Sequence, residues 1–187
     1  MWDPRKNARR QSALAAFCGM AAGLSVVIML MGGIIPAATY AVPMLCGLLL
    51  LPILLEFGAK AAWITYLATA LIALLMGFDK EAAFFYIFIG YYPIVKWKLD
   101  RIRSRPLRLA AKLGLFTGAI VIMYGFMYLL FPLQAFAQEF REMGIWLSTL
   151  FVLVYDLCML IYDRLLLPLS MIYINRIRPR LSFLLRQ

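Results

Sequence analysis

Residues 12–33 read SALAAFCGMAAGLSVVIMLMGG, and none of these 22 side chains is charged. An α-helix of that length rises about 33 Å, and the hydrocarbon core of a bilayer is about 30 Å thick. Four basic residues precede the run, as they do in a signal peptide. The apolar core of a signal peptide is only about 7–15 residues long. We therefore interpret residues 12–33 as a first membrane span that is not cleaved.

The rest of the chain is also strongly apolar. Hydrophobic residues make up 65% of the 187 positions, and the mean hydropathy is +0.86, whereas soluble domains are about half apolar. A small soluble domain cannot bury such a surplus, because it keeps a large fraction of its surface in water. The apolar runs are continuous and do not alternate as barrel strands do. We therefore predict an all-α polytopic integral membrane protein that forms a single transmembrane domain over residues 1–187.

Six apolar runs divide the chain. Three consecutive charges at 79–81 mark a turn, because they would not lie in mid-bilayer. Pro43 and Pro52 lie within the second run, which is either a kinked packing helix or an irregular helix lining a cavity. Pro93 is expected to bend the short fourth run. The predicted spans are residues 12–33, 34–55, 61–78, 82–95, 109–131 and 145–173.

Basic residues fall on one side of this six-span topology. Of the 19 Lys and Arg residues, 16 lie in the N-terminus, the 56–60 turn, the 96–112 loop and the tail from residue 175. Cytoplasmic loops of membrane proteins are enriched in Lys and Arg. We therefore predict that both termini are cytoplasmic, with the chain in the plasma membrane, which in a bacterium is the inner membrane. This topology explains the net charge of +10 without a nucleic-acid partner.

Catalysis has little support in the sequence. The chain has no histidine, so the commonest general base and a common metal ligand are missing. It also lacks an HExxH motif and a phosphate-binding glycine loop. Cys18, Cys46 and Cys158 lie in apolar runs without CxxC spacing, which favours inert packing thiols. We predict that the chain is not an enzyme and that it holds neither a cofactor nor a metal.

The predicted sixth span contains Asp156, Asp163 and Arg164. The two aspartates are seven residues apart, which places them on one helix face about 10 Å from each other. Charges within a span usually face the protein interior and pair. The candidate partners are Lys96, Lys112, Lys60 and Arg164. Two interpretations stay open, namely a structural ion pair near the inner interface and a path for a proton or substrate.

Two further patterns indicate contacts with other molecules. Small residues recur every four positions in the first span, at Ala15, Gly19 and Gly23, and such a stripe lets another helix approach closely. That helix belongs either to this chain or to a separate membrane protein. Aromatic residues near the predicted outer ends of the spans are either interfacial anchors or the wall of a pocket for a flat organic solute. These candidate substrate-binding residues are Tyr40, Phe84, Phe85, Tyr128 and Trp146.

These features together resemble the S components of energy-coupling-factor transporters, which are small substrate-binding membrane subunits of vitamin and micronutrient importers. The resemblance covers most of the chain and rests on six predicted spans in 187 residues, a basic N-terminus and a small-residue first helix. The segments IPAATY (35–40) and GYYPIVK (90–96) are similar to parts of S components of unknown substrate. The resemblance implies that Ala15, Gly19 and Gly23 dock on a transmembrane coupling subunit, although the stripe of the family is richer in alanine.

The resemblance also implies a mechanism. The chain would bind a small organic solute near its outer face and tilt to release it inside, while a separate pair of ATPase subunits hydrolyses ATP. The absence of histidine argues against the nickel- and cobalt-specific branch of the family. Two alternatives remain. One is a stand-alone proton-coupled carrier that uses Asp156 and Asp163, and the other is a membrane scaffold or regulatory protein that only binds a partner.

Overall fold

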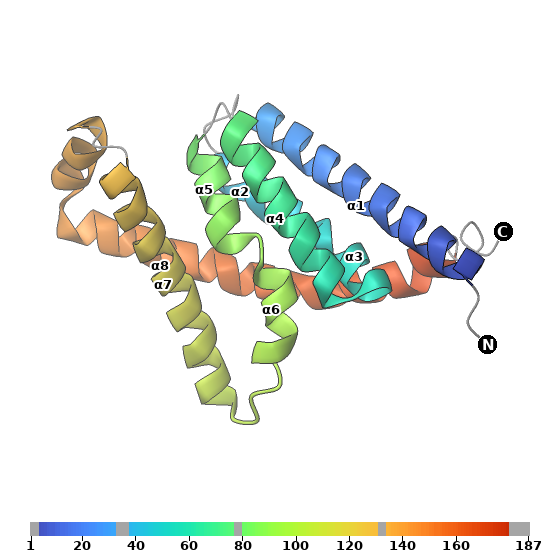
Figure 1. Ribbon diagram of the computed structural model, residues 1–187. Coiled ribbons are helices and arrows are strands. Elements are labelled where there is room, and N and C mark those ends of the chain that lie inside the picture. The colour runs from blue at the N-terminus through green and yellow to red at the C-terminus, as the bar shows by residue number, and fades with distance from the viewer. Residues whose placement is uncertain (1–3, 33–37, 77–79, 131–133, 180–187) are drawn as a thin grey trace. The chain divides into compact units, whose positions relative to one another are not determined.

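The computed structural model describes residues 4–32, 38–76, 80–130 and 134–179 (Figure 1). Within these ranges the chain is helical apart from short turns and contains no strand, which confirms the all-α prediction. The helices are α1 (Pro4–Gly32), α2 (Ala38–Leu48), α3 (Leu50–Phe57), α4 (Ala59–Met76), α5 (Lys80–Ile89), α6 (Tyr92–Leu99), α7 (Arg105–Leu130) and α8 (Gln134–Ile172), followed by a π-helix, η1 (Tyr173–Ile177).

Three helical segments of the described chain are long and apolar enough to cross a membrane. They are Gln11–Gly32 in α1, Ala59–Met76, which is α4, and Arg105–Phe126 in α7. Large apolar side chains on these helices remain exposed, among them Ile64 at 68% and Leu75 at 85%. Exposed apolar surface of this extent suits lipid better than water. The described helices therefore indicate a membrane protein.

The second and fourth apolar runs, in which prolines predicted a kinked, irregular or bent helix, are each interrupted. The second run is divided at Leu49 into α2 and α3, three residues before Pro52. Proline has no N–H for the carbonyl four residues earlier, and its ring crowds that carbonyl. In the fourth run, α5 ends at Ile89, four residues before Pro93, and α6 begins at Tyr92. Each run therefore consists of two shorter helices.

The polar stretch 134–144 between the fifth and sixth predicted spans is helical and not a loop, because α8 already begins at Gln134 and continues for 39 residues. The segment is rich in Ala, Gln, Glu, Arg and Met, which favour helix, and it contains no proline. Pro168 lies inside α8 without ending it. The sixth span, predicted at 145–173, is thus part of a longer helix.

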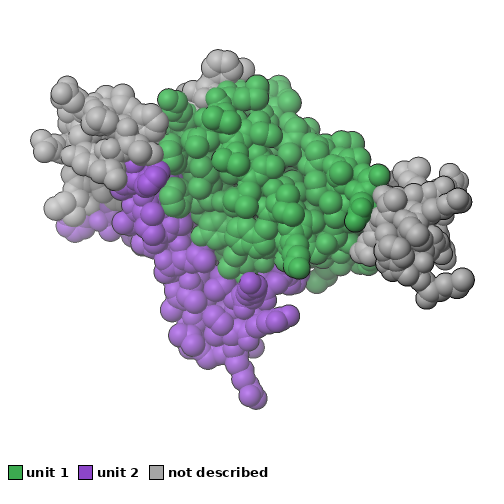
Figure 2. Space-filling view, in the orientation of Figure 1, with its two compact units in different colours: residues 1–95, 166–187 green, residues 96–165 purple. Residues whose placement is uncertain are grey.

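The chain forms two compact units, of which unit 1 comprises residues 1–95 and 166–187 and unit 2 comprises residues 96–165 (Figure 2). In unit 1, α4 packs against α1, α3 and α5, and α2 packs against α1 and α5 (Figure 1). The core side chains Cys46, Ile53 and Tyr86 are 0% exposed. The Tyr66 hydroxyl donates a hydrogen bond to the Ile87 carbonyl and so joins α4 to α5. Unit 1 therefore has a packed core of its own.

In unit 2, α7 and the part of α8 before residue 166 run antiparallel. Three side-chain contacts show this register: Lys112 with Asp163, Thr117 with Asp156, and Tyr124 with Phe151. The contacts advance along α7 as they go back along α8, which is the pattern of antiparallel helices. This pairing brings polar side chains from two predicted spans to one helix–helix interface.

Candidate functional site

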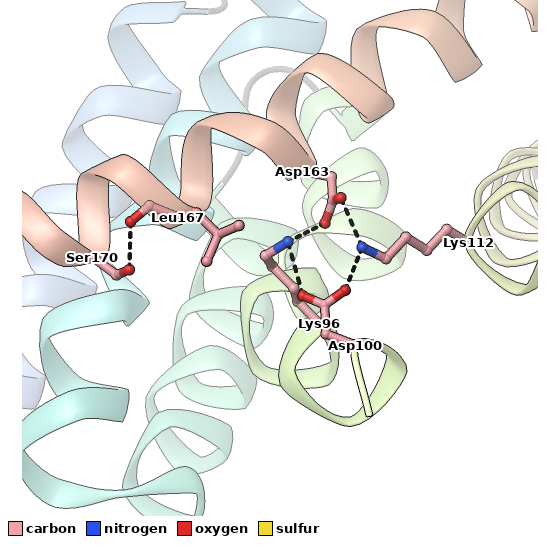
Figure 3. Close-up of polar contacts among 6 residues, drawn as sticks. All are labelled: Lys96, Asp100, Lys112, Asp163, Leu167 and Ser170. Carbon is pink, nitrogen blue, oxygen red and sulfur yellow. Dashed lines mark hydrogen bonds and ion pairs between the residues drawn. The ribbon is translucent and has the colours of Figure 1, made fainter. Parts of the chain in front are cut away.

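Two lysines and two aspartates of unit 2 form a closed ring of ion pairs, which we call the charge quartet (Figure 3). The Lys96 Nζ atom contacts Asp163 Oδ1 and lies 3.2 Å from Asp100 Oδ2. The Lys112 Nζ atom lies 2.6 Å from Asp100 Oδ1 and 2.7 Å from Asp163 Oδ2. Each charge has two partners of opposite sign, so the quartet as a whole is neutral.

Three helices position the quartet. Lys96 and Asp100 are four residues apart at the end of α6, and the Asp100 N–H donates to the Lys96 carbonyl at 2.9 Å. This last helical turn places both side chains on one face. The short connection between Leu99 and Arg105 reverses the chain, so that Lys112 of α7 reaches the same carboxylate. Asp163 of α8 closes the ring from the opposite side (Figure 3).

The quartet is largely removed from solvent. Its side chains are 1% exposed at Lys96, 7% at Lys112, 10% at Asp163 and 27% at Asp100. Buried charges are tolerated only when they are paired and hydrogen-bonded. Burial alone raises the pKa of Asp100, but hydrogen bonds from Lys112 and Lys96, and the charges of these lysines, outweigh burial and hold its pKa below the usual 3.8. The Asp100 carboxylate is therefore ionised at neutral pH.

The quartet links helices through ion pairs. Both carboxylate oxygens of Asp100 and both of Asp163 face a lysine ammonium group. Each of the four carboxylate oxygens is therefore engaged by a lysine. The ring links α6, α7 and α8 through ion pairs.

Asp156 has a different environment, although it lies on the same face of α8 as Asp163. Its Oδ2 atom accepts a hydrogen bond of 2.9 Å from the Thr117 hydroxyl. Its Oδ1 atom is buried and accepts no hydrogen bond from the chain as described. None of the ion pairs found within the described ranges includes Asp156. Asp156 thus keeps one oxygen for a proton, a water molecule or a solute.

The structure shows which of the predicted partners contact the aspartates. Lys96 and Lys112 both bind Asp163. Lys60 and Arg164 are exposed and are not part of the quartet. These contacts favour the structural ion pair for Asp163, while the proton or substrate path stays a prediction.

Sequence reasoning missed two features of the described chain. Asp100 was not among the predicted site residues, although its spacing from Lys96 is that of a helical ion pair. This spacing indicates an ion pair only if α6 stays helical from Lys96 up to Asp100. An aromatic cluster in unit 1 was also missed, in which Trp63 stacks on Tyr91 with ring centroids 6.1 Å apart and Tyr66 meets both rings edge-on. The spacing of Trp63 and Tyr66 by three residues on α4 was its local signal.

The small-residue stripe of α1 is exposed on the surface of the described chain. Ala15, Gly19 and Gly23 are exposed. A Cβ atom built on Gly19 or Gly23 would have no atom of the described chain within 4 Å beyond its own helix backbone and chain neighbours. By contrast, a Cβ on Gly32 of the same helix would lie 2.6 Å from Val42 Cγ2. Within the described ranges the stripe is therefore free of packing contacts at both glycines.

The candidate substrate-binding aromatics differ in placement. Phe84 and Phe85 on α5 are 4% and 0% exposed, which makes them core side chains. Trp146 on α8 is 92% exposed. Tyr40 lies in α2 and Tyr128 in α7, but both side chains fall outside the described residues. Of the three candidates whose side chains are described, Trp146 is the one directly accessible to a solute.

Comparison with known proteins identifies no relative of this chain. No family model matches the chain, and no curated protein and no solved structure is significantly similar to it. Among the described residues, no three His, Cys, Asp or Glu side chains gather as a metal site would require.

Proposed function

We propose that this chain is the substrate-binding membrane subunit of an ATP-driven importer, an S component of the energy-coupling-factor type. It captures a small organic solute, such as a vitamin, at the outer face and docks on a transmembrane coupling subunit. The observation that carries the proposal is the open stripe of Ala15, Gly19 and Gly23 on a membrane-length helix. In membrane helices, small residues at this spacing allow the close backbone approach that helix–helix docking needs.

The proposal includes six membrane crossings with both ends in the cytoplasm. The broken second and fourth runs would each cross as a pair of short helices, since α2 with α3 and α5 with α6 each extend over about 20 residues. The ion pairs support this topology. The quartet joins residues of the predicted 96–112 loop to Asp163, in the inner half of the predicted sixth span, and Arg178 of the tail lies 3.1 Å from Glu56 near the end of α3. In each case the joined residues lie on, or toward, the predicted cytoplasmic side.

Docking can be tested by co-expressing the chain with the coupling subunit and ATPase pair of its host and purifying through a tag on the ATPase. Gly19→Leu and Gly23→Leu should reduce recovery of the chain at least about tenfold, because leucine holds the partner helix away. Neither variant should lower the stability of the chain alone, since both sites are open. Gly114→Leu is the matched control, because Gly114 is also an exposed helical glycine with open space around it.

The outcomes separate clearly. Recovery of the unchanged chain and of the Gly114 variant, with loss of the two α1 variants, supports docking through the stripe. Equal recovery of all four chains would refute docking through the stripe. Failure of the unchanged, folded chain to co-purify at all would refute the assignment as an S component.

A second candidate function is a proton-coupled carrier, and Asp156 is the observation that favours it. Its buried Oδ1 atom has no hydrogen-bond partner within the described chain, and ionisable residues inside a membrane often mark proton paths. A pH-sensitive dye inside proteoliposomes would report proton entry when a mixture of vitamins is added without ATP. Proton entry that disappears in Asp156→Asn would favour the carrier. A membrane scaffold would show neither proton entry nor capture of a solute.

A further inference from the structure

The quartet leaves a surplus of positive charge on the segment that carries it. The basic residues of this segment outside the quartet are Lys98, Arg101, Arg103, Arg105 and Arg108. None of the five forms an ion pair within the part of the chain that the structure describes, and all but the half-buried Arg108 are exposed. The only acid nearby in sequence is Asp100, and both of its oxygens are held by lysines. The carboxylate therefore cannot neutralise the arginines that follow it.

Apolar side chains lie among these free cations. Trp97 precedes the connection and is 36% exposed, and near the start of α7 Leu107 and Leu109 are 61% and 48% exposed. The candidate membrane span begins at Arg105. Its 22 residues rise about 33 Å, slightly more than the hydrocarbon thickness of about 30 Å. The basic residues at its start therefore fall at the depth of the lipid headgroups, where tryptophan is also enriched.

We propose that residues 97–109, here called the basic segment, bind the phosphate headgroups of anionic lipids. The ligand must be amphipathic, because exposed leucines and a tryptophan lie beside the cations. A lipid satisfies both features, with its phosphate on the arginines and its acyl chains on Leu107 and Leu109. Arginine suits this role because its planar guanidinium group binds phosphate oxygens in a bidentate manner. A free phosphate ion would leave the apolar side chains without a role.

The inference also explains why the lysines and arginines of one loop have different surroundings. Lys96 and Lys112 face Asp100 and Asp163 inside unit 2, whereas Arg101, Arg103 and Arg105 are exposed. By holding Asp100 inward, the quartet keeps the outer face of the basic segment uniformly positive. A uniformly positive face at headgroup depth attracts anionic lipid by about a factor of five per basic residue.

Native mass spectrometry of the full chain in detergent can test the proposal. The probes are dioleoyl phosphatidylglycerol and dioleoyl phosphatidylcholine, which have the same acyl chains and differ in headgroup charge. The unchanged chain should bind the phosphatidylglycerol at least about tenfold more tightly. The triple variant Arg101→Gln, Arg103→Gln, Arg105→Gln should lose about 100-fold in affinity for it, given about fivefold per residue.

A matched triple variant removes the same charge elsewhere, through Lys60→Gln, Arg164→Gln and Arg176→Gln, all at exposed positions. It should keep the preference for phosphatidylglycerol. An equal loss in both triple variants, or no preference in the unchanged chain, would overturn the proposal. If the first triple does not fold, single Arg→Gln variants at the same positions should each lose about fivefold. Displacement of the lipid by excess inorganic phosphate, but not by chloride at equal ionic strength, would overturn the lipid assignment in favour of a free-anion site.

Discussion

Replacing Asp163 by asparagine should destabilise the chain far more than the same replacement at Asp156. In Asp163→Asn, Lys96 and Lys112 are left with only the Asp100 carboxylate between them. The buried site then carries one uncompensated positive charge. In Asp156→Asn, the side-chain carbonyl can still accept the hydrogen bond from Thr117, and no ion pair is broken.

The size of the effect follows from the distances. With an effective dielectric constant of about 20, unit charges 2.7 Å apart, as in Lys112 and Asp163, attract by about 6 kcal/mol before desolvation is counted. Removing one partner of a buried pair costs about 3–5 kcal/mol. We expect about 3 kcal/mol, the lower end of the range, because the 27% exposure of Asp100 lets water screen the leftover charge. For a chain of this length the unfolding midpoint should fall by about 6–12 °C.

The double variant Lys112→Met, Asp163→Asn tests whether electrostatics is the cause. It restores neutrality and leaves Lys96 paired with Asp100. The second substitution should therefore cost less in the background of the first, with a coupling free energy of about 2–3 kcal/mol.

Thermal unfolding of the purified chain, followed by circular dichroism in one detergent, is the assay. The Asp156→Asn control should lose less than about 1 kcal/mol. Arg178→Gln should also lose less than about 1 kcal/mol, because Arg178 is 54% exposed and its contact with Glu56 is screened by water. The reasoning is refuted if Asp163→Asn is no more harmful than these controls, or if the free-energy losses of the two quartet substitutions simply add.

Three further predictions use the same unfolding assay. The pKa of Asp100 in the folded chain lies below 3.8, so its stabilisation is present above that value and is lost as the pH falls through the folded pKa; Asp100→Asn should remove this part of the acid dependence. Gly90→Ala should cost about 1–3 kcal/mol, because the new Cβ would lie 2.6 Å from the Tyr86 carbonyl oxygen, whereas Gly114→Ala at an open helical position should be neutral or stabilising by up to about 1 kcal/mol. Tyr66→Phe should cost about 1 kcal/mol, since it removes the hydroxyl that binds an α5 carbonyl, and no change in midpoint would show that this bond does not contribute.

The fold was predictable from sequence where an apolar run has no proline. Residues 12–33, 61–78 and 109–131 correspond to helical segments long enough to cross a membrane. The runs with Pro52 and Pro93 are divided into shorter helices, because a proline within an apolar run can either kink a helix or end it. Which occurs depends on whether neighbouring groups satisfy the freed carbonyl, and sequence spacing does not show this. The polar residues 134–144 lie between two predicted spans, and hydropathy cannot distinguish a polar helix from a loop.

For the site, the sequence predicts which residues share a helix face, but it does not predict which residues they contact. The seven-residue spacing of Asp156 and Asp163 placed both on one face, and both contact α7. Their partners depend on the register between α7 and α8, which brings Lys112 to one aspartate and Thr117 to the other. Nothing local in either helix encodes that register. The role of Asp100 depended in addition on where α6 ends, and helix ends are the least certain part of a sequence-based prediction.

The positive charges between residues 96 and 112 have two separate physical roles. Pairing with Asp100 and Asp163 distinguishes the lysines of the quartet from the arginines of the basic segment. Lys112 lies about 10 Å along α7 beyond Arg105, so a membrane helix that begins at Arg105 carries this lysine toward the hydrocarbon. An unpaired charge near the centre of a span costs about 2.5–3.5 kcal/mol, and an ammonium group at the boundary still loses much of its water. Asp100 and Asp163 replace that water and leave the quartet neutral. In the proposed topology the arginines before Lys112 lie at headgroup depth, where the proposed lipid phosphates would bind them without any acidic side chain. The basic residues would then place the loop on the cytoplasmic side, while the two acidic residues would determine how deeply α7 can begin.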